Sequence, residues 1–106
     1  IDLGTPVLAS SISLGTIQVW PQWVFFPQFV KFEVSSDGIN FTEIKTINNT
    51  IPVGARDTQI QDFVAKFPEQ KIKVVRVTAK NLGKCPAGHP GENQAAWLFV
   101  DEIIVE

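Results

Sequence analysis

Apolar and polar residues alternate along much of this chain, whereas the spacing of an amphipathic helix does not recur. Near the start, Leu8, Ile12 and Leu14 fall on one side of a segment whose other side is small or polar. Residues 30–35 alternate strictly between apolar and polar side chains. Successive residues of a strand point to opposite faces, so both segments are predicted to be strands with one buried face.

Turn signals separate these segments from the next ones. Ser36-Asp37-Gly38 favours a tight turn, because glycine accepts the positive φ that other residues resist. Residues 41–47 then read as the returning strand of a hairpin. Residues 48–57 contain Pro52 and Gly54 and are predicted to form a loop.

The second half of the chain predicts three more strands, at 58–65, 72–79 and 97–105. In 72–79 the apolar positions change parity between Val74 and Val75, which indicates a bulge or a central strand covered on both faces. A similar shift occurs around Asp101. In total, about six or seven short strands separated by turns predict an antiparallel sandwich or barrel.

Length and charge narrow the class of protein. The 106 residues contain no internal repeat or linker and are predicted to form a single β-sandwich domain spanning 1–106. The net charge is −2 with mixed signs, whereas nucleic acid and anionic membrane surfaces attract clustered Lys and Arg. No apolar run is long enough to insert into a bilayer. We therefore expect neither a nucleic-acid partner nor membrane insertion.

The stretch from Leu82 to Phe99 holds the only Cys and the only His of the chain. Cys85 and His89 have a C-x3-H spacing, but a structural zinc site takes four ligands of these types and the chain has two. A Cys–His nucleophile needs an enforced geometry and an orienting third group, which a Pro- and Gly-rich loop does not supply. We expect Cys85 to pack as a small hydrophobe. His89 either caps the loop or touches a ligand, and the structural role is favoured.

Paired carboxylates can hydrolyse glycosides. Asp101-Glu102 is the only acidic pair with apolar residues on both sides, and adjacent strand residues point to opposite faces. We therefore expect no enzyme activity from this domain.

Aromatic residues are dense between Val19 and Phe29. Indole faces suit the C–H faces of sugars, although large aromatics in a small sandwich mostly form the core. Five aromatic residues lie in this stretch: Trp20, Trp23, Phe25, Phe26 and Phe29. We expect at least three of them to be buried and the two tryptophans to be partly exposed. Arg56-Asp57 is expected to be a solvated surface pair.

Four ordered segments resemble a known family. They are "IDLG" (1–4), "FVKFEVSSDGINFTEI" (29–44), "VVRVTAKNLG" (74–83) and "AAWLFVDEIIVE" (95–106). This set resembles the discoidin or coagulation-factor-type C-terminal family, a galactose-binding-like jelly roll. The tail from Cys85 is similar to accessory modules at the C-terminus of bacterial β-N-acetylhexosaminidases, the chitobiase-like enzymes of Bacteroidetes. Modules of that family are longer, so the resemblance implies a fragment lacking its first strands.

The resemblance also implies a ligand site. Family members hold sugar between two loops at one end of the sandwich, which correspond to 16–28 and 81–97 here. The implied sugar-binding residues are Trp20, Gln22, Trp23, His89, Asn93 and Trp97. The Arg and Asn of galactose-binding members are replaced here by Gln18, Gln22 and Gln28. Glu102 matches a calcium ligand whose partners would lie upstream, so we expect at most a partial site, no cofactor in this chain, and calcium only in a complete module.

The function implied by the resemblance is a non-catalytic carbohydrate-binding accessory module of an exported bacterial glycoside hydrolase. Its partners would be a glycan containing N-acetylglucosamine or galactose and the catalytic domain of the same polypeptide, in the periplasm or on the cell surface. The alternative is a structural β-sandwich that packs against the catalytic domain without binding sugar, because protein interfaces favour tryptophan as well.

Overall fold

The computed structural model describes all residues 1–106 and contains five strands, which form one antiparallel sheet. The strands are β1 (Asp2–Gln18), β2 (Phe29–Ser35), β3 (Thr42–Asn48), β4 (Gln59–Ala79) and β5 (Phe99–Val105). One 3₁₀ turn, η1 (Trp20–Gln22), is the only helix, and it is far too short to cross a bilayer. The predicted all-β antiparallel class is confirmed. The predicted number of strands is wrong, because segments 58–65 and 72–79 belong to the single 21-residue strand β4.

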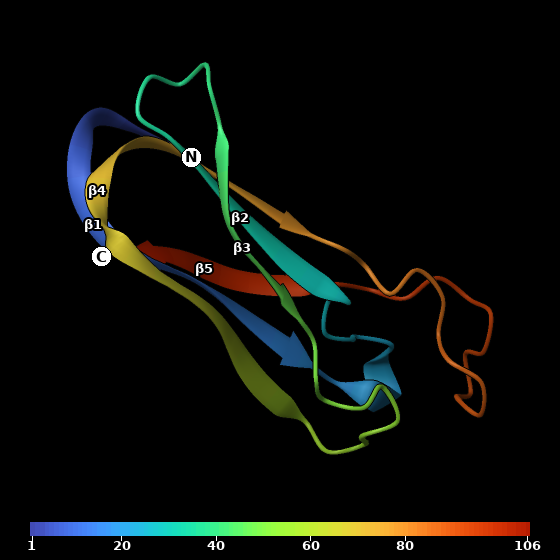
Figure 1. The fold of residues 1–106 in the computed structure, drawn as a ribbon. Coiled ribbons are helices and arrows are strands. Elements are labelled where there is room, and N and C mark those ends of the chain that lie inside the picture. Colours follow the sequence, from blue (N-terminus) through green and yellow to red (C-terminus); the bar gives the residue numbers. More distant parts are fainter.

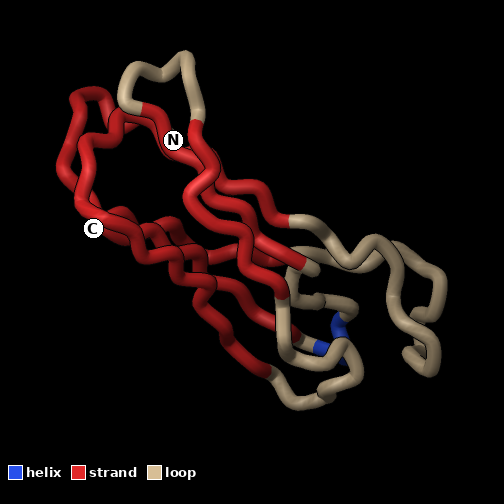
Figure 2. Tube along the Cα trace, viewed as in Figure 1, coloured by secondary structure: helices blue, strands red, loops and turns tan.

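The sheet folds over on itself to make two layers (Figures 1 and 2). Its strand order is β3-β2-β4-β1-β5. The first part of β4 pairs with β1, from Gln59 opposite Gln18 to Ile72 opposite Val7, and its last part pairs with β2. Side chains of β1 and β2, which are not neighbours in the sheet, nevertheless share one buried cluster. The two ends of the sheet therefore face each other across a common core, as in a β-sandwich.

The parity change in β4 falls where the strand passes from one layer to the other. Val74 pairs with both Asp2 of β1 and Ser35 of β2. Ile72 and Val75 are both buried, one on each side of this junction. The pairing of β1 with β4 changes register between Asp2–Val74 and Val7–Ile72, which supports the bulge interpretation of the parity change. This part of β4 is not covered on both faces, because Arg76 and Thr78 are exposed.

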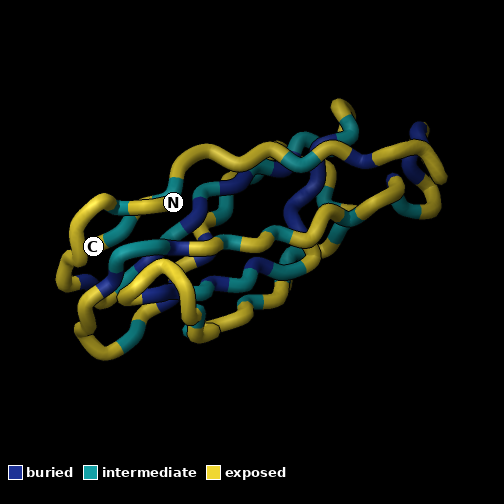
Figure 3. Tube along the Cα trace, turned by 90° about the horizontal axis from the view of Figure 1, so that it is seen from above, coloured by how far each residue is buried: buried dark blue, intermediate teal, exposed yellow.

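The core takes alternate residues from each layer. Its ten buried members are Ala9, Ile12, Leu14, Val30, Phe32, Val34, Phe63, Ala65, Ile72 and Val75. Burying a large apolar side chain stabilises the fold by about 1.5–3 kcal/mol, so Phe32 and Phe63 are major contributors. Figure 3 shows these buried segments enclosed by exposed ones.

The β2–β3 hairpin turns where predicted. Gly38 has a φ of 81°, and the Asp37 carboxylate accepts hydrogen bonds from the backbone N–H groups of Ile39 and Asn40 at 2.8 and 2.9 Å. These bonds hold the pKa of Asp37 well below its usual value. The charged Asp37 side chain therefore stabilises the turn, together with the Ser35 hydroxyl, which accepts the N–H groups of Asp37 and Gly38.

Three connections gather at the end of the molecule opposite both termini (Figure 1). They are residues 19–28, which contain η1, residues 49–58, and the long connection 80–98. The hairpin turn at 36–41 lies at the other end, near the termini. The predicted convergence of the tryptophan-bearing connections is thereby confirmed.

Candidate functional site

The tryptophan-bearing connections are joined by main-chain hydrogen bonds. The N–H of Trp97 donates to the carbonyl of Trp23 at 2.8 Å, and the N–H of Phe25 donates to the carbonyl of Trp97 at 3.1 Å. Val24 and Trp97 form a parallel bridge. We call this region the aromatic end; its aromatic members are Trp20, Trp23, Phe25, His89 and Trp97.

His89 lies inside the aromatic end and is only 4% exposed. Its Nδ1 accepts the N–H of Gly91 at 2.9 Å, so the proton sits on Nε2, which donates to the carbonyl of Trp20 at 2.6 Å. The ring also packs edge-on against Trp20 and Phe25, with centroid separations of 4.3 and 5.4 Å. This geometry gives His89 a structural role, and neither ring nitrogen is free to bind a sugar hydroxyl.

Trp23 is half-buried and packs under the long connection. A methyl group on Gly91 would lie 2.6 Å from Cε2 of Trp23, so only glycine permits this approach. Trp23 itself has a φ of 64°, a left-handed conformation that is rare for bulky residues. Such a residue costs about 1–3 kcal/mol and persists only where the surroundings hold it.

Trp20 is also half-buried, and the guanidinium of Arg56 lies 4.6 Å from its ring centroid. Cation–π contacts of this kind contribute about 0.5–1 kcal/mol at exposed sites. Arg56 therefore has a partner on another connection. Arg56 and Asp57 are both exposed, as expected, but they form no ion pair with each other.

The other three residues implied by the family resemblance are exposed to solvent. Trp97 is 60% exposed, and Gln22 and Asn93 are exposed as well. Gln22 ends η1, whereas Asn93 has a φ of 66° and donates its N–H to the carbonyl of Cys85 at 3.3 Å. Their side chains are the ones that a ligand in solution can reach.

A small second core supports the aromatic end. Phe25, Cys85 and Ala96 are buried together, and Trp20, Trp23 and Leu82 pack against them. Burial raises the pKa of the Cys85 thiol, which packs as the predicted small hydrophobe. The expected burial of at least three aromatics between Val19 and Phe29 is wrong, because only Phe25 and Phe26 are buried. The partial exposure expected for both tryptophans is confirmed.

Gln18 joins two of the three connections, 19–28 and 49–58, to the sheet and was not predicted to do so. Its side chain is fully buried; Nε2 donates to the carbonyl of Ala55, and Oε1 accepts the N–H of Phe26, both at 3.2 Å. The signal for this role is the alternation of β1, in which Gln18 continues the inward side of Ile12 and Leu14. A buried amide on that side requires such partners.

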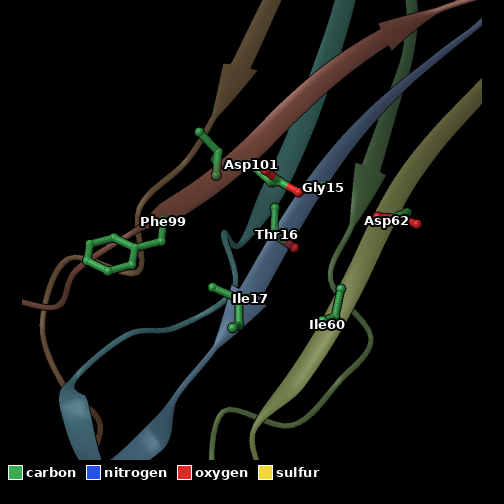
Figure 4. A pocket seen from close by; sticks show the side chains of 8 residues that line it. Gly15, Thr16, Ile17, Ile60, Asp62, Phe99 and Asp101 are labelled. Atoms are coloured by element: carbon green, nitrogen blue, oxygen red, sulfur yellow. The ribbon is translucent and has the colours of Figure 1, made fainter.

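The one pocket of the structure lies away from the aromatic end, on the outer surface of β4, β1 and β5. It has a volume of about 320 Å³. Figure 4 shows side chains from the three strands around it. Its lining residues are Gly15, Thr16, Ile17, Ile60, Asp62, Phe99, Val100 and Asp101. Sequence reasoning missed it, because it depends on which outward side chains of three strands become neighbours.

Glu102, which the resemblance implies as a calcium ligand, is exposed on β5. Calcium takes about six to eight oxygen ligands, and no group of three or more acidic, His or Cys side chains gathers in the structure. Glu102 is therefore not joined by two further side chains of these types.

A ligand at the aromatic end can stack on the exposed indole of Trp97, and the exposed carboxamides on the same connections are those of Gln22 and Asn93. The outer pocket offers apolar contact and negative charge instead. No family model matches this chain, and no curated protein matches it.

Proposed function

We propose that this protein is a non-catalytic carbohydrate-binding module with a galactose-binding-like jelly-roll fold. The observation that carries the proposal is the exposed indole of Trp97 on connections that are fixed to each other by hydrogen bonds. A rigid, exposed aromatic ring presents a flat apolar face to the C–H groups of a sugar ring at small entropic cost.

The polar contacts would come from Gln22 and Asn93. Each carboxamide both donates and accepts hydrogen bonds, which suits sugar hydroxyls and the acetamide of N-acetylglucosamine. Trp20, Trp23 and His89 act as positioning residues in this proposal, because their faces or nitrogens already contact the protein. The ligand is a glycan containing N-acetylglucosamine or galactose.

The module would act as part of an exported bacterial glycoside hydrolase of the β-hexosaminidase type, in the periplasm or on the cell surface. Holding the catalytic domain of the same polypeptide near a polymeric glycan raises its effective concentration there without any bond-making by the module. The resemblance of the four segments described above supports this placement.

Isothermal titration with oligomers of N-acetylglucosamine and of galactose tests the proposal. Truncating a central aromatic of a binding site costs on the order of 1–2 kcal/mol, so Trp97→Ala should weaken binding by about five- to thirtyfold. Ile39→Ala is the matched control, since Ile39 is 81% exposed in the hairpin turn at the opposite end. Equal affinity of Trp97→Ala and the wild-type protein for the sugar would refute the proposal.

A second candidate function is a structural sandwich that docks on its catalytic domain. It is favoured by apolar side chains left exposed on the outer surface of β4, β1 and β5, among them Ile60 at 77% and Phe99 at 52%. Contiguous exposed apolar surface of this kind marks interaction sites. Sugar binding that is lost in Trp97→Ala supports the first function, and tight association with a separately produced catalytic domain supports the second.

A further inference from the structure

Strand β5 is an open edge of the sheet. It pairs with β1 on one side only, so the backbone N–H and C=O groups on its other side are available to another strand. The opposite edge, β3, carries exposed Glu43 and Lys45, charges of the kind that protect an edge from pairing. β5 also carries two exposed charges, Asp101 and Glu102, but unlike β3 it exposes the large apolar side chains Phe99, Val100 and Ile104. Of the two edges, β5 is the one suited to accept a partner strand.

The apolar surface of β5 continues across the neighbouring strands. Ile17 of β1 pairs with both Phe99 of β5 and Ile60 of β4. Ser13 pairs likewise with Ile104 and Val64, and these two are 42% and 40% exposed. We call this surface the outer face; it comprises the pocket residues together with Val64 and Ile104.

Two carboxylates meet in the middle of the outer face. A methyl group on Gly15 would lie 3.4 Å from Oδ1 of Asp62 and 3.8 Å from Oδ2 of Asp101, so both carboxylates reach the same point above this glycine. Figure 4 shows them on β4 and β5, on either side of β1. Because Gly15 has no side chain, the space above it stays open. The two carboxylates flank this space, and apolar residues of the outer face lie beyond it.

These carboxylates have no basic partner in the protein. The two ion pairs of the structure both involve Glu33 of β2. β5 adds Glu102 and carries no Lys or Arg, and Lys66 is the only basic residue on β5 and the segments 11–18 and 59–66. The charge of the outer face therefore complements a basic ligand.

We propose that an extended segment of a partner protein, which carries apolar residues and a Lys or Arg on the same face, adds to β5 as a further strand. Main-chain hydrogen bonds to the open edge supply affinity, and side-chain pockets supply specificity, as in other cases of strand addition. On that face the apolar side chains contact Phe99 and Ile104 of the adjacent strand β5, and the long basic side chain reaches across β5 toward Asp101 and the space above Gly15. The inference deepens the docking function by naming its mode and chemistry, and it is independent of carbohydrate binding.

The test uses backbone amide NMR of the protein and a synthetic ten-residue peptide. Thr occupies every second position of the peptide, and the positions between carry Val with one central Lys, so that Val and Lys share one face. We expect shifts confined to β5, residues 13–17 of β1 and residues 60–64 of β4. Two control peptides are used. One replaces Lys by Glu. The other carries N-methyl groups on alternate amides, so that the N–H groups along one edge of the peptide cannot donate hydrogen bonds to β5. Neither control should bind.

The matched variant is the double substitution Asp62→Asn with Asp101→Asn, which keeps shape and removes charge. It should weaken binding of the Lys peptide by about three- to tenfold, as expected for two solvent-accessible charge pairs. Unchanged affinity of this variant, or equal binding of the Glu peptide, overturns the charge complementarity. Equal binding of the N-methylated peptide overturns strand addition. Concentration-dependent dimerisation through β5 makes a second copy the occupant and also overturns the proposal, whereas loss of sugar binding in Trp97→Ala leaves it unaffected.

Discussion

The Nε2 atom of His89 lies 2.6 Å from the carbonyl oxygen of Trp20, a residue 69 positions earlier in the chain. The same carbonyl accepts the N–H of Trp23 at 3.2 Å and thereby closes η1. The carbonyl oxygen of Trp20 thus joins the long connection 80–98 to the connection 19–28. The exposed position of Trp97 depends on this anchoring, because Trp97 pairs with the residues that immediately follow η1.

Replacing His89 should loosen this end of the molecule. His89→Phe keeps a ring but leaves the buried N–H of Gly91 without an acceptor, so the free energy of unfolding should fall by about 1–3 kcal/mol. Chemical denaturation measures the change. His89→Asn offers an oxygen close to the position of Nδ1 and should lose less. A His89→Phe protein as stable as wild type would contradict the role given to this histidine.

Gly91 should not tolerate a side chain. In Gly91→Ala the new methyl would lie 2.6 Å from the indole of Trp23, and overpacking of this kind costs about 1–3 kcal/mol. Gly54→Ala is the control, since nothing lies within 4 Å of its Cβ position and its φ is not in the left-handed region. Thermal unfolding should show a lower Tm for the first variant and no such loss for the second. Equal losses in both variants would mean that the indole is not packed against Gly91.

Cys85 should react slowly with thiol reagents in the folded protein. The side chain is 3% exposed, and burial raises its pKa above the ordinary value, so both access and the reactive thiolate are reduced. The rate of modification at pH 8 should be far higher in denaturant than in buffer. Comparable rates in the two conditions would place the thiol at the surface.

Asp37 should make the stability depend on pH in the acidic range. The native-state pKa lies below the ordinary value of 3.8, so between the two values the unfolded chain binds more protons than the folded one. The contribution of Asp37 is therefore fully present above that value and is lost as the pH falls through the native-state pKa. The difference in free energy of unfolding between the wild-type protein and Asp37→Ala should shrink as the pH is lowered from 6 to 2. A difference that stays constant would show that the charged form is not what holds the turn.

The strands were largely predictable because alternation reports burial directly. The exception is the middle of β4, where Pro68 and its polar neighbours interrupt the pattern. The segment remains a strand because residues on both sides of it pair with β1, at Ser11–Lys66 and Ala9–Gln70, with a register irregularity between these pairs. Pairing with a distant segment overrides the local sequence there, and local sequence alone does not reveal that partner.

The candidate site was predictable only in part. The family resemblance implies that both tryptophan-bearing connections meet at one end of the sandwich. Nothing in the local sequence indicates that both ring nitrogens of His89 form hydrogen bonds with main-chain groups. These groups approach each other only after the sheet has folded over. The outer pocket is harder still, since Gly15, Asp62 and Asp101 come from three strands and individually resemble ordinary surface residues.

The most direct test of the carbohydrate-binding account is an NMR titration that follows the three indole N–H signals, one for each tryptophan. With millimolar oligomers of N-acetylglucosamine or galactose, the signal of Trp97 should shift progressively, whereas those of Trp20 and Trp23 should move little. Indole signals that all stay in place throughout both titrations would contradict the account.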